Sequence, residues 1–178
     1  MRDVEWILAL DLASRFGWAE GANGGKPNCG SKRCAIEGAG TPEIFGNYTK
    51  WLSQKLIDRT PDVLVYEAPL ATIHVRGHTT VKVTRILFGL AAITEGIAYR
   101  MGVRSIREAS VNEVRKHFIG VGNLPGNEAK RAVGVRCRQL GYEIDDHNAG
   151  DAAALWDYTA SVRHAGHAVK ATPLFQEK

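Results

Sequence analysis

Two acidic residues stand where a folded chain can hold a carboxylate rigidly. Asp11 ends the apolar run Val4–Asp11, and Glu67 ends a second apolar run, Val63–Glu67. Runs that are apolar on both faces are typical of strands buried on both sides of a sheet. If both strands deliver their acids to one edge, two like charges meet there, which is unfavourable unless a cation lies between them. Oxygen-only ligands favour Mg²⁺ or Mn²⁺ over zinc.

A third acid, Asp151, begins a predicted apolar helix that runs through Trp156. Asn148 lies three residues before Asp151, so both side chains project from one face of the first helical turn. His147 lies near the same face, whereas Asp146 points away from it if it is helical. A purely local interpretation stays open, in which Asn148 caps the helix and Asp151 interacts favourably with the helix dipole.

The elements that must position these acids follow from the apolar periodicity and the turn residues. Thr41 followed by Pro42 is typical of a helix start, Ser110 with Glu113 forms a capping box, and Gly141 ends a helix. We predict strands over 4–11, 15–20, 33–37, 63–67 and 103–107 and a loop over 21–30. We predict helices over 41–60, 80–101 and 127–140, a short helix that opens at Ser110, and an apolar helix that begins near Asp151 and runs through Trp156. Three antiparallel strands followed by two that alternate with helices indicate an α/β domain, with a mixed five-stranded sheet, covering residues 1–178.

Composition narrows the class of protein further. The chain has 178 residues, 24% of them charged, and a formal net charge of +4, which permits nucleic-acid binding without requiring it. The apolar stretch 86–103 is interrupted by Glu95 and Arg100, so we interpret it as a core helix rather than a membrane span. The first residues lack the apolar core of a signal peptide. We therefore expect a soluble, cytoplasmic protein.

Three sequence contexts together carry a family resemblance. Asp11 precedes Gly-Trp-Ala, Glu67 lies in Val-Tyr-Glu-Ala-Pro, and Asp151 lies in Asn-Ala-Gly-Asp-Ala-Ala-Ala-Leu. With the glycine-rich stretch 120–130 and the order of elements, the chain resembles the RuvC-like Holliday junction resolvases of the ribonuclease H-like superfamily. It is most similar to their phage and prophage branch. The resemblance covers most of the chain and implies a ribonuclease H-like fold.

The resemblance also implies an activity. The protein would be a crossover junction endodeoxyribonuclease, which resolves four-way DNA junctions by paired phosphodiester hydrolysis in recombination and repair, in a bacterial or phage-infected cell. Asp11, Glu67 and Asp151 would be catalytic and would bind two Mg²⁺ ions per site, with Mn²⁺ able to substitute. Asn148 stands where the family usually has a further acid, so the fourth ligand is Asn148 or, in its place, His147 or Asp146.

Contacts to DNA are expected around these acids. Lys130 matches a basic position of the family's glycine-rich segment, and Leu70 stands where some members have an aromatic residue that stacks on unpaired bases. Arg76, Lys82 and Arg85 follow Glu67 in the sequence, and we expect them to bind the DNA backbone. An aliphatic Leu70 could wedge into a junction but could not stack.

A stripe of small residues, Gly89, Ala92 and Gly96, lies on the predicted 80–101 helix. Such a stripe lets another backbone approach closely. Two interpretations stay open: the stripe packs on the protein's own sheet, or it forms the seam of a two-fold homodimer. A dimer would match the two-fold symmetry of a four-way junction.

Three other functions are compatible with the same candidate residues. A related ribonuclease H-like nuclease could act on flaps, other branched intermediates or RNA. An actin-like or sugar-kinase ATPase half also ends its first strand in Asp, but it needs a second phosphate loop, of which 149–152 is a poor version. A DNA-structure-binding protein with weakened catalysis is the third alternative, and Asn148 favours it because an amide carries no charge.

Overall fold

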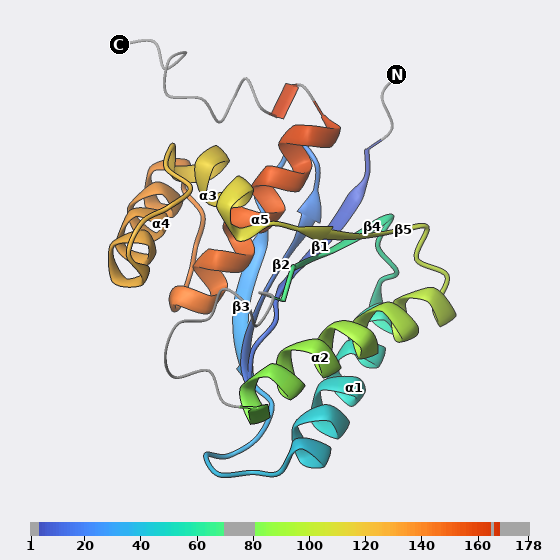
Figure 1. Ribbon diagram of the computed structural model, residues 1–178. Coiled ribbons are helices and arrows are strands. Elements are labelled where there is room, and N and C mark those ends of the chain that lie inside the picture. The colour runs from blue at the N-terminus through green and yellow to red at the C-terminus, as the bar shows by residue number, and fades with distance from the viewer. Residues whose placement is uncertain (1–3, 70–80, 165, 168–178) are drawn as a thin grey trace, which may run out of the picture.

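The computed structural model describes residues 4–69, 81–164 and 166–167, and within them five strands form one mixed sheet (Figure 1). The strands are β1 (Trp6–Asp11), β2 (Arg15–Ala22), β3 (Asn28–Arg33), β4 (Val63–Glu67) and β5 (Ser105–Ala109), in the spatial order β3-β2-β1-β4-β5. β1, β2 and β3 pair antiparallel, whereas β4 pairs parallel to β1 and β5 parallel to β4. The predicted order of three antiparallel strands followed by two parallel ones is confirmed.

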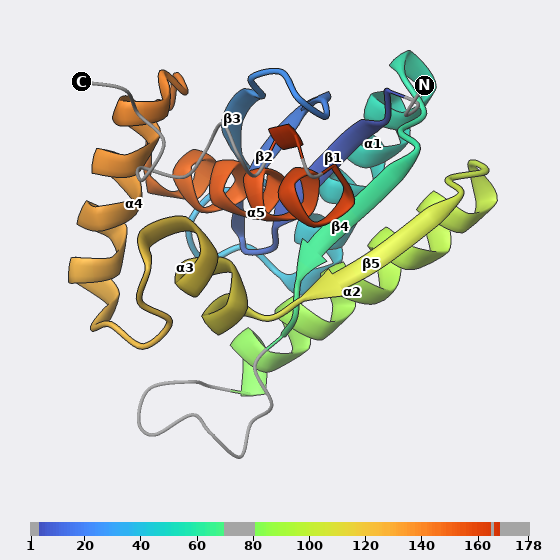
Figure 2. The ribbon, with the colours of Figure 1, turned by 90° about the horizontal axis from the view of Figure 1, so that it is seen from above.

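Helices cover both faces of this sheet. They are α1 (Thr41–Asp58), α2 (Val81–Arg100), α3 (Val111–Ile119), α4 (Gly126–Leu140) and α5 (His147–Arg163). α1 and α2 lie on one face, and α5 lies on the other with α3 and α4 beside it (Figures 1 and 2). In the described part of the chain, no helix is long and apolar enough to cross a membrane.

The central strand β1 contributes side chains to two separate cores. Ile7 and Ala9 pack in the cluster that includes the buried alanines of α5, and Leu8 and Leu10 pack in the cluster with α1 and α2. These four residues are at most 2% exposed. Successive side chains of a strand point to opposite faces, so the side chain of Asp11 is directed to the same face as Ile7 and Ala9, which is the face covered by α5.

The third strand is not where the sequence pattern predicted it. The prediction was a loop over 21–30 and a strand over 33–37, but β3 spans Asn28–Arg33 and pairs along β2 from Arg15↔Arg33 to Glu20↔Asn28. Its residues lack the β-branched and aromatic types that mark strands. Gly30 lies directly against the Trp18 ring, where an added β-carbon would be 2.7 Å from a ring carbon. The glycine that suggested a loop is therefore required for close packing.

Further boundaries also differ from the prediction: β2 extends to Ala22 and α5 to Arg163. β5 spans Ser105–Ala109 rather than 103–107, because its pairing partner β4 places Val63 opposite Ser105. Gly40, not Thr41, is the N-cap residue of α1, so Pro42 falls in the second helical position. Gly141 ends α4 in the left-handed conformation with φ of 67°, as the sequence predicted.

Candidate active site

Adjacent strand ends bring the first two acids together. β1 and β4 pair in parallel with Leu10 opposite Tyr66, so Asp11 and Glu67 are the next residues along two neighbouring strands. Neighbouring strands lie about 4.8 Å apart. Val65 packs in the α5-side core, and the alternation of β4 therefore directs Glu67 to the same face as Asp11.

The helix that carries the third acid is anchored by Asp146. This residue is the N-cap of α5, and its Oδ1 accepts a hydrogen bond from the backbone N–H of Ala149 at 3.0 Å. Its Oδ2 accepts from Ser31 Oγ at 2.6 Å and from Arg15 Nε at 3.0 Å. The local interpretation with Asn148 as cap is therefore wrong. Both oxygens of Asp146 are engaged in fixing α5 to β2 and β3, which makes Asp146 a poor candidate for a metal ligand.

The three acids share one desolvated region. Burial raises the pKa of Asp11 well above its usual range, and the charges of Glu67 and Asp151 raise it further. Burial also raises the pKa of Glu67 to about 7, with a contribution from Asp151. The pKa of Asp151 is likewise raised by burial. The three acids therefore disfavour one another's ionisation across one desolvated region, and positive charge brought there would stabilise their ionised forms.

Cationic side chains of α3 and α4 act electrostatically on the same region. Arg115 opposes the rise in pKa at all three acids, and Lys130 opposes it at Asp11 and Asp151. The sequence analysis named Lys130 but missed Arg115. The order of elements could have identified Arg115. It lies on α3, which directly follows β5, and β5 is the neighbour of the strand that ends in Glu67.

The donor set suits a hard divalent cation, although no closed cluster is formed. Among the described residues, no group of three or more His, Cys, Asp and Glu side chains is arranged so that it could hold a metal ion as it stands. The three acids nevertheless offer only oxygen atoms, and their mutual repulsion is relieved by positive charge. His147 opposes the rise in the pKa of Asp151. On donor chemistry, the residues fit Mg²⁺ or Mn²⁺.

The other predicted DNA contacts are not among the residues that shift the acids' pKa values, or they fall outside the described residues. Lys82 Nζ donates a hydrogen bond to the Ala39 carbonyl at 3.0 Å, and Arg85 is exposed on the first turns of α2. Leu70 and Arg76 fall in the segment that the structure does not describe.

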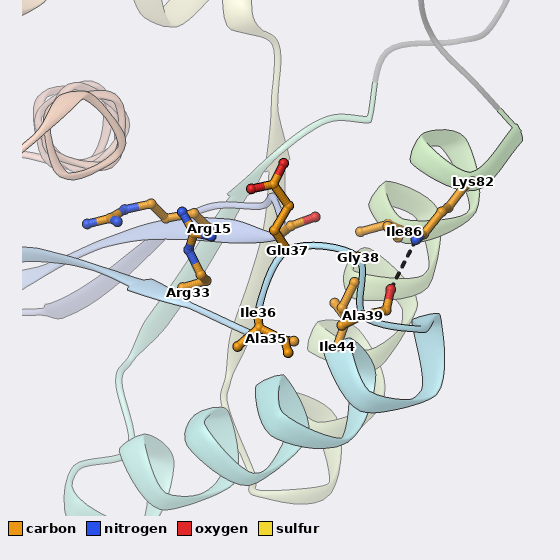
Figure 3. Close-up of a pocket in the computed structure, with 11 residues that line it drawn as sticks. Arg15, Arg33, Ala35, Ile36, Glu37, Gly38, Ala39, Ile44, Lys82 and Ile86 are labelled. Carbon is orange, nitrogen blue, oxygen red and sulfur yellow. Dashed lines mark hydrogen bonds between the residues drawn. The ribbon is translucent and has the colours of Figure 1, made fainter.

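A cavity of about 280 Å³ lies beside Lys82 (Figure 3). It is lined by the start of β2, the segment before α1 and the start of α2, and Figure 3 shows Lys82 reaching across to Ala39. Arg15, one of its lining residues, binds Asp146 at the start of α5. None of the three acids lines this cavity, so it is separate from the candidate active site.

Comparison with solved structures defines the class of fold. No protein-family model matches the chain, and no curated protein sequence matches it. Its architecture is the ribonuclease H-like fold of RuvC-like resolvases, as the sequence resemblance implied.

Three solved structures illustrate the match. Thermus thermophilus RuvC is 15% identical, with 90% of this chain and 96% of that chain covered and a TM-score of 0.65. T. thermophilus RuvC in complex with a Holliday junction substrate is 14% identical, with 90% and 94% covered and a TM-score of 0.67. The yeast mitochondrial Holliday junction resolvase Ydc2 is 12% identical, with 96% and 82% covered and a TM-score of 0.63. At these identities the comparison establishes the fold.

Proposed function

We propose that this protein is a metal-dependent endonuclease that resolves four-way DNA junctions by paired phosphodiester hydrolysis. The observation that carries the proposal is the meeting of Asp11 and Glu67, at adjacent strand ends, with Asp151 at the start of α5. The likeness in fold to two junction resolvases, one of them solved with a Holliday junction substrate, supports this choice of substrate.

The chain's own residues would divide the work at this site. Asp11, Glu67 and Asp151 would hold the ions, and Asn148 would offer its amide oxygen as a peripheral ligand. Bound Mg²⁺ or Mn²⁺, two ions per site, would supply Lewis acidity for the attack of water on phosphorus.

Arg115 and Lys130 would hold the substrate phosphate beside the acids. A phosphodiester brings negative charge into a region that already contains three carboxyl groups. The two cations, which already oppose the rise in the acids' pKa values, would offset that charge as it grows in the transition state. Lys82 and Arg85, on α2, would bind further phosphates of the DNA backbone, as would Arg76. Leu70 would wedge into the junction.

The small residues of α2 do not all lie on one surface: Gly89 faces α1, whereas Ala92 and Gly96 face outward. A β-carbon at Gly89 would lie 2.3 Å from the ring of Phe45, so Gly89 serves the packing of α2 on α1. Gly96 has nothing within 4 Å of its β-carbon position, and Ala92 is exposed. Of the three residues predicted for a dimer contact, Gly89 is therefore excluded, and Ala92 and Gly96 stay available.

A second copy of this chain would pack on that outward face of α2. Phe88 is 49% exposed and Tyr99 is 80% exposed, and helical spacing places both on the same side as Ala92. Large apolar side chains around a small one are suited to a close helix contact, and a two-fold dimer would place two identical sites on the symmetry-related strands of a junction. We therefore propose a homodimer formed through this face.

A cleavage panel tests the proposal. Wild-type protein and Asp11→Asn are incubated with a four-way junction, a flap, duplex DNA, single-stranded DNA and an RNA–DNA hybrid, with Mg²⁺ or with EDTA. We expect Mg²⁺-dependent paired cuts in the junction, which Asp11→Asn abolishes while it retains junction binding. Undiminished cleavage in EDTA would refute the mechanism. A preference for flaps would instead support the related nuclease, and binding without cleavage would support the DNA-structure-binding protein.

A further inference from the structure

Asp157 is a buried carboxylate that takes no part in the site described above. It lies on α5, six residues after Asp151, and its side chain is 1% exposed. Its Oδ1 accepts hydrogen bonds from the Tyr142 hydroxyl at 2.6 Å and from His167 Nε2 at 3.0 Å, and its Oδ2 accepts from His117 Nε2 at 3.0 Å. One helix is thus bonded to three other segments: α3, the residues after α4 and the residues after its own end.

These bonds keep Asp157 ionised inside the protein. Burial alone would raise its pKa, but the hydrogen bonds from His117, His167 and Tyr142 hold the pKa well below its usual range. Oδ1 keeps one bond if either Tyr142 or His167 is lost, but losing His117 would leave Oδ2 as an unsatisfied charged oxygen, which is costly. The three donors are therefore held firmly in place.

The bond to His117 bears on the active site because of what else α3 carries. His117 lies two residues after Arg115, whose charge opposes the rise in pKa at all three acids. α3 is only nine residues long and packs on the core through Val114 and Phe118. Apolar packing is non-directional and constrains the rotation of so short a helix weakly, whereas a hydrogen bond to a fixed carboxylate constrains it strongly.

We propose that Asp157 and His117 are positioning residues, whose hydrogen bond fixes α3 on α5 and so holds Arg115 beside Asp11, Glu67 and Asp151. This inference rests on the proposed function and adds to it. Neither residue touches substrate; both act through Arg115. The edge contact between the His117 and Tyr158 rings, with centroids 5.6 Å apart, holds the imidazole against α5 as well.

Amide hydrogen exchange tests the anchoring without any assay of activity. His117→Ala should speed the exchange of the α3 amides about tenfold while α5 stays protected. His167→Ala is the matched control, because it removes the same kind of bond from the same carboxylate without touching α3. His117→Gln, whose amide can donate a hydrogen bond, should restore most of the protection. Unchanged α3 exchange in His117→Ala would overturn the proposal.

A double-mutant cycle on junction cleavage tests the route through Arg115. His117→Ala should slow cleavage about tenfold in the wild-type background and less than about twofold when Arg115→Ala is already present. Independent, multiplying losses would refute an action through Arg115. If wild-type protein cleaves no branched DNA, the proposed function fails and the role of Arg115 fails with it, while the exchange experiment still decides whether Asp157 anchors α3.

Discussion

The backbone of α5 lies directly against Gly17: a β-carbon at residue 17 would be 1.8 Å from the carbonyl oxygen of Asn148. Gly17 is also the partner of Asp11 in the pairing of β1 with β2. The strand thus lacks a side chain at the point where the helix carrying Asp151 begins. This contact brings the first turn of α5 close to the strand end that carries Asp11.

Replacing Gly17 should therefore damage the site rather than the fold as a whole. Gly17→Ala places a methyl group in the backbone of α5, so the helix start must move away from Asp11. We expect junction cleavage to fall about 100-fold, because misplacement by about 1 Å costs this much in catalysis. Gly46→Ala, on α1 with open space around it, is the matched control and should keep full activity. Full activity in Gly17→Ala, measured by single-turnover cleavage, would contradict the role assigned to this contact.

The raised pKa of Glu67 predicts how stability depends on pH without metal. Its value of about 7 in the folded state exceeds the ordinary 4.5, so the folded protein binds the proton more tightly. The free energy of unfolding should therefore fall as pH rises from about 4.5 to about 7, by about 1–3 kcal/mol from this group.

Denaturant unfolding in EDTA, compared between wild type and Glu67→Gln across this range, measures the effect. The variant's relative stability should grow with pH, and Mg²⁺ should reduce the difference because a bound cation stabilises the ionised form. A difference that does not change with pH would show that Glu67 is not buried among acids.

Asn148 and Asp151 should differ in their importance for cleavage. Asp151→Asn removes a proposed charged ligand and should cost at least about 100-fold, whereas Asn148→Ala removes a peripheral amide and should cost about tenfold. Because Asp146 caps α5, a loss in Asn148→Ala cannot be attributed to a lost cap. Asp146→Ala provides the comparison and should lower stability by about 1 kcal/mol. Equal losses of cleavage rate in Asn148→Ala and Asp151→Asn would show that Asn148 is as important as a charged ligand.

The cations should separate into two groups by their effects. Arg115→Ala and Lys130→Ala should slow cleavage more than they weaken binding, because both charges act on the acids of the proposed site. Lys82→Ala and Arg85→Ala should weaken binding to all branched DNA alike. Each should lower the slope of log binding constant against log salt concentration by about one. Fluorescence anisotropy at several salt concentrations, beside single-turnover rates, distinguishes the groups. A loss limited to one base sequence would make Lys82 or Arg85 a reader of bases.

Blocking the outward face of α2 should separate the two cuts. Ala92→Trp places a large ring where a second copy would pack, so the protein should become monomeric and release nicked junctions instead of resolved duplexes. Val135→Trp, at a comparably exposed position of α4, should leave both properties unchanged. Light scattering and a supercoiled-cruciform assay measure them. A wild-type monomer that still makes paired cuts would eliminate the dimer.

The sequence by itself determined the elements whose signal is local. Apolar runs ending in Asp11 and Glu67 mark buried strands, because burial on both faces excludes polar residues from the strand interior. Gly141 marks the end of α4, because a left-handed residue is needed there. Since these signals depend on a residue and its near neighbours, the element order and the mixed five-stranded sheet were predictable from them. The ribonuclease H-like fold was implied by the family resemblance.

Tertiary structure decided the features that depend on contacts between distant segments. The position of β3 was predicted wrongly because Gly30 is selected by the Trp18 ring rather than by strand propensity. Arg115 reaches the acids only because β5 lies beside β4, and Asp157 acquires its partners only when α3 and α4 dock on α5. A local pattern records whether a side chain is buried, but the neighbour it meets is set by the packing of elements far apart in the chain.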